Sequence, residues 1–580
     1  MGAKGGKAAL ACAAIAALAI TGCSSSGGSG KSSGNNSGGK SGGTLIFGES
    51  TGFPDNLMPL IAAGNSTAGG NLEVRLLDGP FRVSPKFTYI PDNDQATSAT
   101  STMVNGQQVV DIKINPKAVW ADGQPITAAD YVFTWQATKS SDPKAGGCAA
   151  LLSTVGVDQI ESATAVNDHE VKFTFMKGKP FPDWQGLFAA GNGGLPVLSK
   201  HVFDKGSPKA DCDYITKGWP VADGIPLGAQ NGPWLLEKSN IDVSNKTFTL
   251  VHNPKYWGAA PKLDKLVDAY IGSDSDTNVK ALQNQEVNMV YPQPQLDLVS
   301  NLQSLTNVTT EINFGVAFEH FDFNTADPLL AHKEIREAIA YAIDRPALVK
   351  ATVGAFSDKA SVLNNRLLMT NQPGYEDHGG DYAQQNLAKA KSLLTGIGCT
   401  VGNAKTPTTC FGKPLTFKVI TTQDNPLRDQ TIQIAAQQVS AIGIKLNEYA
   451  DPNIFGGPND SQSLASEQFQ IALFAWVGGP SISSNASIYL SPKGGGVGQN
   501  YTQGGTPQID AALKSMTSAA NTQDEIKYAN QADALLWQQM YTLPLYQKPT
   551  LLAFDSNYSG IADNATQAGP LWNSDTFTKD

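Results

Sequence analysis

The sequence predicts a mixed α/β protein, because two hydrophobic periods alternate along the chain. Residues 169–175 alternate apolar and polar side chains, as a half-buried strand does. Residues 334–344 instead place their isoleucines on one stripe of a helix. The alternation then repeats as strand, helix and strand in three consecutive segments, at 415–420, 429–443 and 444–446. Such alternation is typical of α/β folds.

Elements in the first half have clear local signals. Residues 44–48 read as a strand, and a loop rich in glycine and proline follows at 49–59. Thr127 and Asp130 have the spacing of a capping box, so we expect a helix to begin there. A further strand is expected at 248–251.

Elements in the second half are bounded by caps and turns. A helix at 387–394 is expected to end at Gly396, and Asp429 is expected to cap the next helix. Residues 469–476 form an apolar strand signal. The proline-containing segment 542–548 reads as an edge segment of a sheet.

The first 43 residues predict export. Two lysines precede an apolar run at 8–20, which is too short to span a bilayer and fits a secretory signal. The run ends in Ile-Thr-Gly-Cys23, which resembles the lipobox of bacterial lipoproteins. That resemblance implies cleavage after residue 22 and a diacylglycerol on Cys23; an ordinary signal peptide is the alternative. Residues 23–43 are almost all Ser, Gly, Asn and Lys, which is typical of a flexible tether. We therefore expect a lipid-anchored protein on the outer face of the bacterial cytoplasmic membrane.

Charge excludes one class of partner. The precursor has a net charge of −10, and residues 1–22 carry two lysines and no acid, so the mature chain is more acidic still. Nucleic acids require a basic binding surface. We expect no nucleic-acid partner.

Four cysteines remain in the mature chain besides Cys23. An even number in an exported protein indicates two disulfides. Cys399 and Cys410 flank a short polar loop, which favours a local bond, and Cys148 would then pair with Cys212. A zinc site is the alternative, although no CxxC spacing is present.

No catalytic constellation can be assembled from the spacing of residues. The six histidines are scattered, and none belongs to an HExxH motif. Disulfides and lipidation leave no free thiol as a nucleophile. The sequence therefore predicts a protein that is not an enzyme and that needs no metal or cofactor.

Several segments, taken in order, resemble the large extracellular solute-binding proteins of ABC-type peptide importers. The matching segments span nearly the whole mature chain, at 120–135, 231–234, 253–258, 334–345, 387–394, 429–444 and 543–546. Each is weak alone, and their common order makes the resemblance specific. It implies a bilobed clamshell of the periplasmic-binding-protein type, in its large three-domain form (type II). The implied partners are a peptide or other small solute and the permease and ATPase subunits of an importer.

The resemblance also implies a domain organisation. One lobe is built from residues 44–75, 216–315 and 546–580, an inserted packing domain spans 76–215, and the other lobe spans 316–545.

The same resemblance implies where ligand binds. Contacts come from the loop after the first strand, from a tryptophan-bearing junction and from a final tyrosine segment, here Glu49, Thr51 and Phe53; Ala475, Trp476, Val477 and Gly479; and Tyr546 and Gln547. Main-chain groups there would pair with an extended peptide. Trp476 would supply an apolar wall, with core packing as its alternative role.

One departure from the family pattern concerns the ligand's charge. Many relatives carry an aspartate a few residues after the tryptophan, which pairs with the peptide ammonium, whereas residues 477–481 contain no acid. Either Glu49 reads a positive ligand end, or the ligand is a blocked peptide, a sugar or another uncharged solute. The leading hypothesis is a receptor for an importer. The second is an envelope lipoprotein that reuses the fold to regulate a membrane partner.

Overall fold

The computed structural model describes residues 41–189, 195–456, 460–477, 481–495 and 499–580. The export signal, Cys23 and nearly all of the tether lie outside these residues, so those expectations stay predictions. Within the described part, no helix has both the length and the apolar character needed to cross a membrane.

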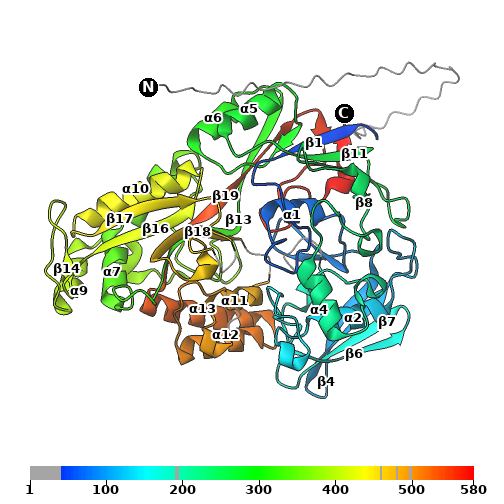
Figure 1. Ribbon diagram of the computed structural model, residues 1–580, viewed down its shortest axis with the longest axis horizontal. Coiled ribbons are helices and arrows are strands. Elements are labelled where there is room, and N and C mark those ends of the chain that lie inside the picture. Colours follow the sequence, from blue (N-terminus) through cyan, green and yellow to red (C-terminus); the bar gives the residue numbers. More distant parts are fainter. Residues whose placement is uncertain (1–40, 190–194, 457–459, 478–480, 496–498) are drawn as a thin grey trace, which may run out of the picture. The chain divides into compact units, whose positions relative to one another are not determined.

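A large mixed sheet organises the described chain (Figure 1). Its strands follow the spatial order β17 (Lys445–Asp451), β16 (Thr416–Thr422), β18 (Ile471–Val477), β13 (Val308–Phe323), β19 (Thr542–Asp555), β12 (Met289–Val290), β1 (Thr44–Glu49), β11 (Lys265–Tyr270), β10 (Thr247–His252) and β8 (Trp234–Leu235), with β9 (Ile241–Asp242) paired to β10.

Two sets of parallel strands meet at the centre of this sheet. On one side β16 pairs in parallel with β17 and β18, and on the other β1 pairs in parallel with β11 and β12. The long strands β13 and β19 run antiparallel between the two sets, from Asp322 opposite Thr542 to Val308 opposite Asp555. This pair therefore joins both halves of the sheet.

The expectation that residues 542–548 form a sheet edge is wrong. They begin β19, which lies between β13 and β12. Pro544 is tolerated there because the ladder shifts register between Glu319 and His320, and the bulge leaves Leu545 without a partner on β13.

Smaller sheets complete the strands. A four-stranded sheet has the order β4 (Ala96–Val104), β5 (Gln107–Ile114), β7 (Glu170–Phe175) and β6 (Ile160–Asn167). Three short pairs are β2 (Phe81–Val83) with β3 (Tyr89–Pro91), β14 (Thr409–Cys410) with β15 (Lys413–Pro414), and β20 (Tyr558–Ser559) with β21 (Thr578–Lys579).

Helices alternate with these strands, as the sequence predicts. They are α1 (Thr67–Glu73), α2 (Ala128–Thr138), α3 (Lys200–Phe203), α4 (Pro208–Lys217), α5 (Ser275–Gln283), α6 (Leu296–Gln303), α7 (Lys333–Ala342), α8 (Arg345–Ala351), α9 (Leu387–Gly396), α10 (Pro426–Ser440), α11 (Ala486–Tyr489), α12 (Pro507–Thr517) and α13 (Thr522–Gln539).

The capping predictions have mixed outcomes. The capping box of α2 is confirmed, because the Thr127 amide donates to the Asp130 carboxylate over 2.8 Å. Asp429 is not the cap of α10: Asn425 accepts from the Arg428 amide, and Pro426 occupies the first turn. Both Asn425 and Asp429 are capping residue types, and the proline marks the earlier start.

The end of α9 also differs from the prediction. Gly396 is the last helical residue and Ile397 follows it as the cap. Gly398 is the residue with a left-handed backbone, with φ of 82°. Gly396 and Gly398 lie two positions apart, and the sequence alone does not indicate which of them adopts the left-handed conformation that ends the helix.

Buried side chains form separate cores. One surrounds α7, α10 and the β16 side of the sheet, and another surrounds β1, β10 and β11. A third lies on the four-stranded sheet, with Trp120 and Phe173 at its centre. The exact domain boundaries stay a prediction.

The structure contains both expected disulfides, Cys148–Cys212 and Cys399–Cys410. The first links residues 64 positions apart and the second links residues 11 positions apart. In the chain-entropy model, a bond that closes a longer loop restricts the unfolded chain more strongly.

We predict that removing the long-range disulfide destabilises the protein more. The pair Cys148→Ser/Cys212→Ser should lower the free energy of unfolding by about 4 kcal/mol, against about 3 kcal/mol for Cys399→Ser/Cys410→Ser. Urea unfolding of both double variants measures this difference. Peptide mapping without reduction is the control, and a free thiol at any of the four positions in the wild type would contradict the pairing.

Candidate functional site

Three neighbouring strands present one face at the centre of the large sheet. Trp476 on β18 lies directly opposite Phe318 on β13, and Phe318 lies opposite Gln547 on β19. Residues paired in this way project to the same side of a sheet. The fold therefore brings Trp476 and Gln547, 71 positions apart in the sequence, onto one surface, which we call the central face.

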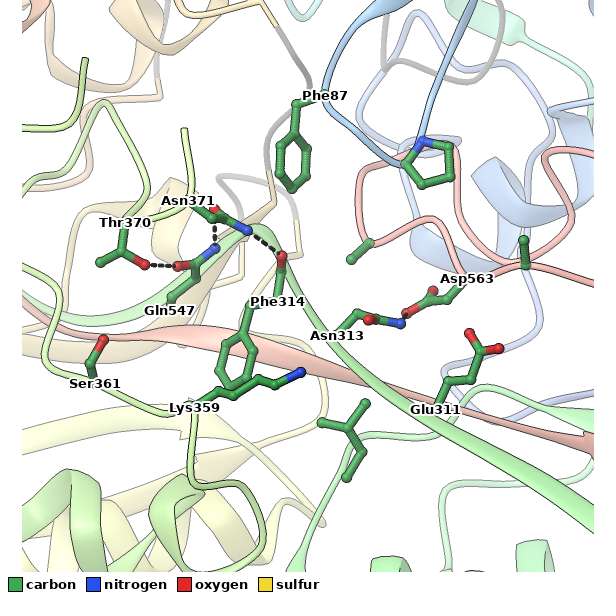
Figure 2. Close-up of a pocket in the computed structure, with 14 residues that line it drawn as sticks. Phe87, Glu311, Asn313, Phe314, Lys359, Ser361, Thr370, Asn371, Gln547 and Asp563 are labelled. Atoms are coloured by element: carbon green, nitrogen blue, oxygen red, sulfur yellow. Dashed lines mark hydrogen bonds between the residues drawn. The ribbon is translucent and has the colours of Figure 1, made fainter. Parts of the chain in front are cut away.

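A pocket of about 560 Å³ lies beside Gln547 (Figure 2). Pockets of this size hold small ligands in other proteins. Its wall combines the strands β13 and β19 with loops from both ends of the chain, and it is lined by Pro85, Phe87, Glu311, Ile312, Asn313, Phe314, Lys359, Ser361, Thr370, Asn371, Gln547, Ala562, Asp563 and Ala565.

The Gln547 amide is held in one orientation by its neighbours. Its nitrogen donates to the Gly315 carbonyl and, over 2.8 Å, to the Asn371 side chain, while its oxygen accepts from the Thr370 hydroxyl over 2.7 Å (Figure 2). Asn371 in turn donates to the Phe314 carbonyl over 2.8 Å. Because these partners, on β13 and in the loop at Thr370 and Asn371, fix Gln547 on β19, the polar wall is built before any ligand arrives.

A glycine makes this wall possible. The β13–β19 ladder shifts register between Phe314 and Phe318, which frees the Gly315 carbonyl for Gln547. A side chain on Gly315 would place its first carbon 1.6 Å from the Ala565 carbonyl oxygen. Only glycine lets β13 approach the loop that carries Asp563, so this position is set by close packing.

Carboxyl groups occupy another part of the pocket. Asp563 is buried and accepts hydrogen bonds from Tyr291 at 2.8 Å, Asn313 at 3.0 Å and Thr550 at 2.5 Å. Burial raises the pKa of Asp563, and burial followed by the nearby charge of Asp563 raises the pKa of Glu311. Lys359 extends from an exposed position on the opposite side of the pocket (Figure 2).

Trp476 belongs to an aromatic cluster on the central face and stays half-exposed. Its ring stacks on Tyr501 with centroids 5.7 Å apart, and it lies parallel to His320 at 6.4 Å. Phe474 meets it edge to face at 5.3 Å. The ring is thus held rigidly, and the part left open is available as an apolar surface.

The comparisons with known proteins agree over nearly the whole chain. Residues 95–498 match the model of the bacterial extracellular solute-binding proteins, family 5. The chain is 30% identical to the oligopeptide-binding protein OppA of Mycobacterium tuberculosis, over 88% of this chain and 82% of that protein.

The chain belongs to family 5 of the bacterial extracellular solute-binding proteins.

Two further relatives extend this assignment. A lipoprotein of Mycobacterium tuberculosis is 21% identical over 89% of each chain. The structure of the periplasmic EDTA-binding protein EppA superposes with a TM-score of 0.82 at 24% identity, covering 94% of this chain and 98% of that one. The fold is the bilobed α/β clamshell of this family, and the relatives are solute-binding proteins rather than enzymes.

The loop after β1 of this solute-binding protein is held by local contacts. The Glu49 carboxylate is buried and accepts hydrogen bonds from the Thr51 amide and hydroxyl, each at 2.6 Å, and from Asn71 at 2.9 Å. Burial raises the pKa of Glu49. Phe53 stacks on Phe248 with centroids 4.9 Å apart. Glu49, Thr51 and Phe53 do not line the described pocket, and their ligand contacts stay expectations drawn from the resemblance.

The final tyrosine segment divides between two faces. Tyr546 lies opposite Glu319, on the side away from Gln547, and its side chain has no exposed surface. Tyr546 therefore packs in the core on the α7 side, whereas Gln547 lines the pocket. The expected ligand contacts of both residues stay predictions. Strand alternation separates the two neighbours.

The junction after β18 lies at a meeting point of distant segments. Ala475 is half-buried, Val477 is exposed, and the Val477 carbonyl accepts from the Gln567 side chain over 2.8 Å. Gly479 lies outside the described residues. The ligand contacts of this junction stay predictions.

Several pocket residues were missed by sequence reasoning. Phe87, Asn313, Asn371 and Asp563 lie in segments without a recognisable motif. Long-range packing of the loops against β13 and β19 brings them together, so no local signal marks them. In the described residues, no group of three His, Cys, Asp or Glu side chains is arranged to hold a metal.

We predict that Glu49 does not select the ligand's charge. Glu49→Gln should leave the affinity ratio between free and N-acetylated peptides unchanged, because its oxygens are occupied by Thr51 and Asn71. Calorimetry with both peptide sets measures the ratio. Glu311→Gln is the matched comparison inside the pocket; a ratio that falls with Glu49→Gln and not with Glu311→Gln would contradict the assignment.

Proposed function

We propose that this protein captures a peptide-like solute on the central face and in the adjoining pocket, and delivers it to the permease and ATPase of an ABC importer. The observation that carries the proposal is the polar wall around Gln547, which is assembled from β13, β19 and the loop that carries Thr370 and Asn371; the two strands join both halves of the sheet. Family membership and the oligopeptide-binding name of the Mycobacterium tuberculosis relative support it.

Capture follows from the position of this wall. A ligand beside Gln547 contacts β13 and β19 together with loops from both halves, so it binds best when the halves are close. A ligand with that preference shifts the population toward the closed form, which the permease then recognises. The affinity comes from fixed amide groups and from the apolar surface of Trp476, with no bond made or broken.

The charges of the pocket define the ligand further. The Asp563 oxygens already accept from Tyr291, Asn313 and Thr550, so the half-buried Glu311 is the pocket carboxyl group that we assign to a ligand ammonium. Lys359 is the pocket cation that we assign to a ligand carboxylate. A short peptide with free ends satisfies both. The open polar pocket favours capture over the purely regulatory role that a blocked apolar cleft would indicate.

Native mass spectrometry of gently purified protein tests the proposed function. We expect a bound mass that leaves on unfolding and whose fragments are those of a peptide. A chain that carries no ligand, and binds no member of a peptide library by calorimetry, would overturn the proposal.

We predict that Trp476→Ala weakens peptide binding by about 1–3 kcal/mol, because it removes an apolar surface from the central face. The matched control is Trp135→Ala on α2, a half-buried tryptophan in contact with Lys139 and distant in the sequence from the site. Calorimetry against the same peptides measures both variants. Equal affinity of Trp476→Ala and wild type would assign this ring to core packing alone.

We propose in addition that a lipid on Cys23 anchors the protein to the outer face of the cytoplasmic membrane. The lipobox-like sequence and the lipoprotein relative support this. Cys23→Ala should leave the chain unprocessed or released into the medium, as read by membrane fractionation and intact mass. A variant that keeps both its mature mass and its membrane location would refute the anchor.

A further inference from the structure

Two carboxyl groups, those of Asp183 and Glu525, lie on either side of the segment that follows β18. Asp183 precedes the short 3-10 helix at Trp184–Gly186, and Glu525 lies in the first turn of α13. Between them lie Ser481 and Ser483, which follow β18. Asp183 belongs to the predicted inserted domain and the other three belong to the predicted second lobe, so this contact, which we call the seam, crosses between them.

Serine hydrogen bonds hold both carboxyl groups in place. Asp183 Oδ2 accepts from the Ser481 hydroxyl at 2.6 Å and from the Ser483 amide at 2.9 Å. Glu525 Oε1 accepts from the same amide at 3.0 Å and from the Ser483 hydroxyl at 2.6 Å. The two carboxyl oxygens therefore share one N–H donor, which brings two acids into close proximity.

No cation balances this pair among the described residues. Neither acid forms an ion pair with a described Lys, Arg or His, and Glu525 is fully buried. Its other oxygen, Oε2, accepts from no described donor. The charge of Asp183 raises the pKa of Glu525. The neighbouring Lys514 of α12 and Lys527 of α13 are exposed and form no ion pair with either acid, and the carboxylate of Asp524 binds Asn521.

The chemistry of two adjacent carboxyl groups then requires a proton. Two carboxylates have acceptors only, so two carboxyl oxygens that meet at one N–H donor repel each other unless one of the groups is neutral. Burial, and after it the charge of Asp183, raises the pKa of Glu525 above its ordinary value of 4.5. Two carboxyl groups that share one hydrogen-bond donor do not both ionise readily.

We propose that Asp183 and Glu525 form a proton-sharing latch that closes the seam. The described arrangement holds one proton between the two carboxyl groups, and separation of the seam releases that proton to water. The latch is distinct from the ligand pocket and adds a pH dependence to the opening and closing of the molecule.

The direction of the pH dependence follows from the raised pKa. The latched form binds a proton that the separated form releases, so it is favoured at low pH. As pH rises above 4.5, each unit weakens the latch by at most about tenfold, until the raised pKa of the latched pair is passed. The seam therefore opens more readily in alkaline than in acidic surroundings.

One further acid lies close to the seam and provides a control. The Gln159 side chain donates to the Thr517 carbonyl over 2.9 Å, which is a second contact between the predicted inserted domain and the predicted second lobe. Its neighbour Asp158 has a pKa that burial raises to about 6. Titration of Asp158 falls at the acidic end of the range, so Asp158→Asn separates its contribution from that of the latch.

X-ray scattering of the full-length Cys23→Ala chain without ligand, from about pH 5 to about pH 9, tests the latch. We expect the radius of gyration of this parent chain to rise with pH. Glu525→Gln should remove the dependence, because an amide carries no charge, and Asp183→Asn should reduce it, because burial still raises the pKa of Glu525. Asp158→Asn should keep the dependence above about pH 7.

Infrared spectroscopy supplies a second measurement that requires no change of shape. Near neutral pH the difference spectrum between the parent chain and Glu525→Gln should contain the carbonyl band of a neutral carboxyl group; other buried acids with raised pKa values, such as Glu73 and Asp268, contribute equally to both spectra. A radius that does not depend on pH in the parent chain, equal pH slopes in the parent and both amide variants, or absence of this difference band would overturn the latch. Since no ligand is involved, these outcomes are independent of whether the protein binds peptides.

Discussion

The antiparallel pairing of β13 with β19 is the interaction on which the rest of the structure depends. Each half of the large sheet has its own parallel strands and its own core, and this one ladder spans both. Main-chain hydrogen bonds along this ladder connect the two halves. A pair of crossing strands of this kind suits a clamshell, because small twists of the ladder move large bodies.

The irregularities of this ladder carry the site. Between Phe314 and Phe318 the register shifts, and the freed Gly315 carbonyl binds the Gln547 amide. Bulges next to functional sites re-aim side chains and end local pairing. Here the bulge interrupts main-chain pairing between β13 and β19, and the Gln547 side chain forms hydrogen bonds at the pocket with Gly315 and Asn371. The same strands therefore provide the mechanical link and the recognition surface.

Two buried ion pairs elsewhere in the protein contrast with the acids of the pocket and the seam. Arg428 binds Glu319 through two nitrogens, and Arg366 contacts Asp533 at 3.0 Å with both side chains fully buried. Asp563 in the pocket is held by neutral donors instead, and the two acids at the seam face each other. Removal of charges from water without opposite charge is costly, so such sites respond to a bound cation or a proton. The seam also begins just after β18, so the strand that carries Trp476 leads directly to Ser481 and Ser483.

The sequence by itself determined what depends on local pattern. Alternation gave the strands and the stripe of isoleucines gave α7, Thr127 and Asp130 marked the start of α2, and the ordered segments identified the family. Cys399 and Cys410 lie close enough along the chain for their disulfide to be expected. Local signals misplaced the cap of α10 because Asn425 and Asp429 are both capping residue types. They also assigned 542–548 to a sheet edge because the sequence does not show the bulge at which Pro544 is tolerated. Tertiary structure alone decided which face each strand residue occupies. The register of β19 places Tyr546 in the core and its neighbour Gln547 at the pocket, and the long-range fold brings Asn71 on α1 against the Glu49 carboxylate. The pocket and the seam depend on residues hundreds of positions apart, and only long-range pairing brings such groups within hydrogen-bond distance.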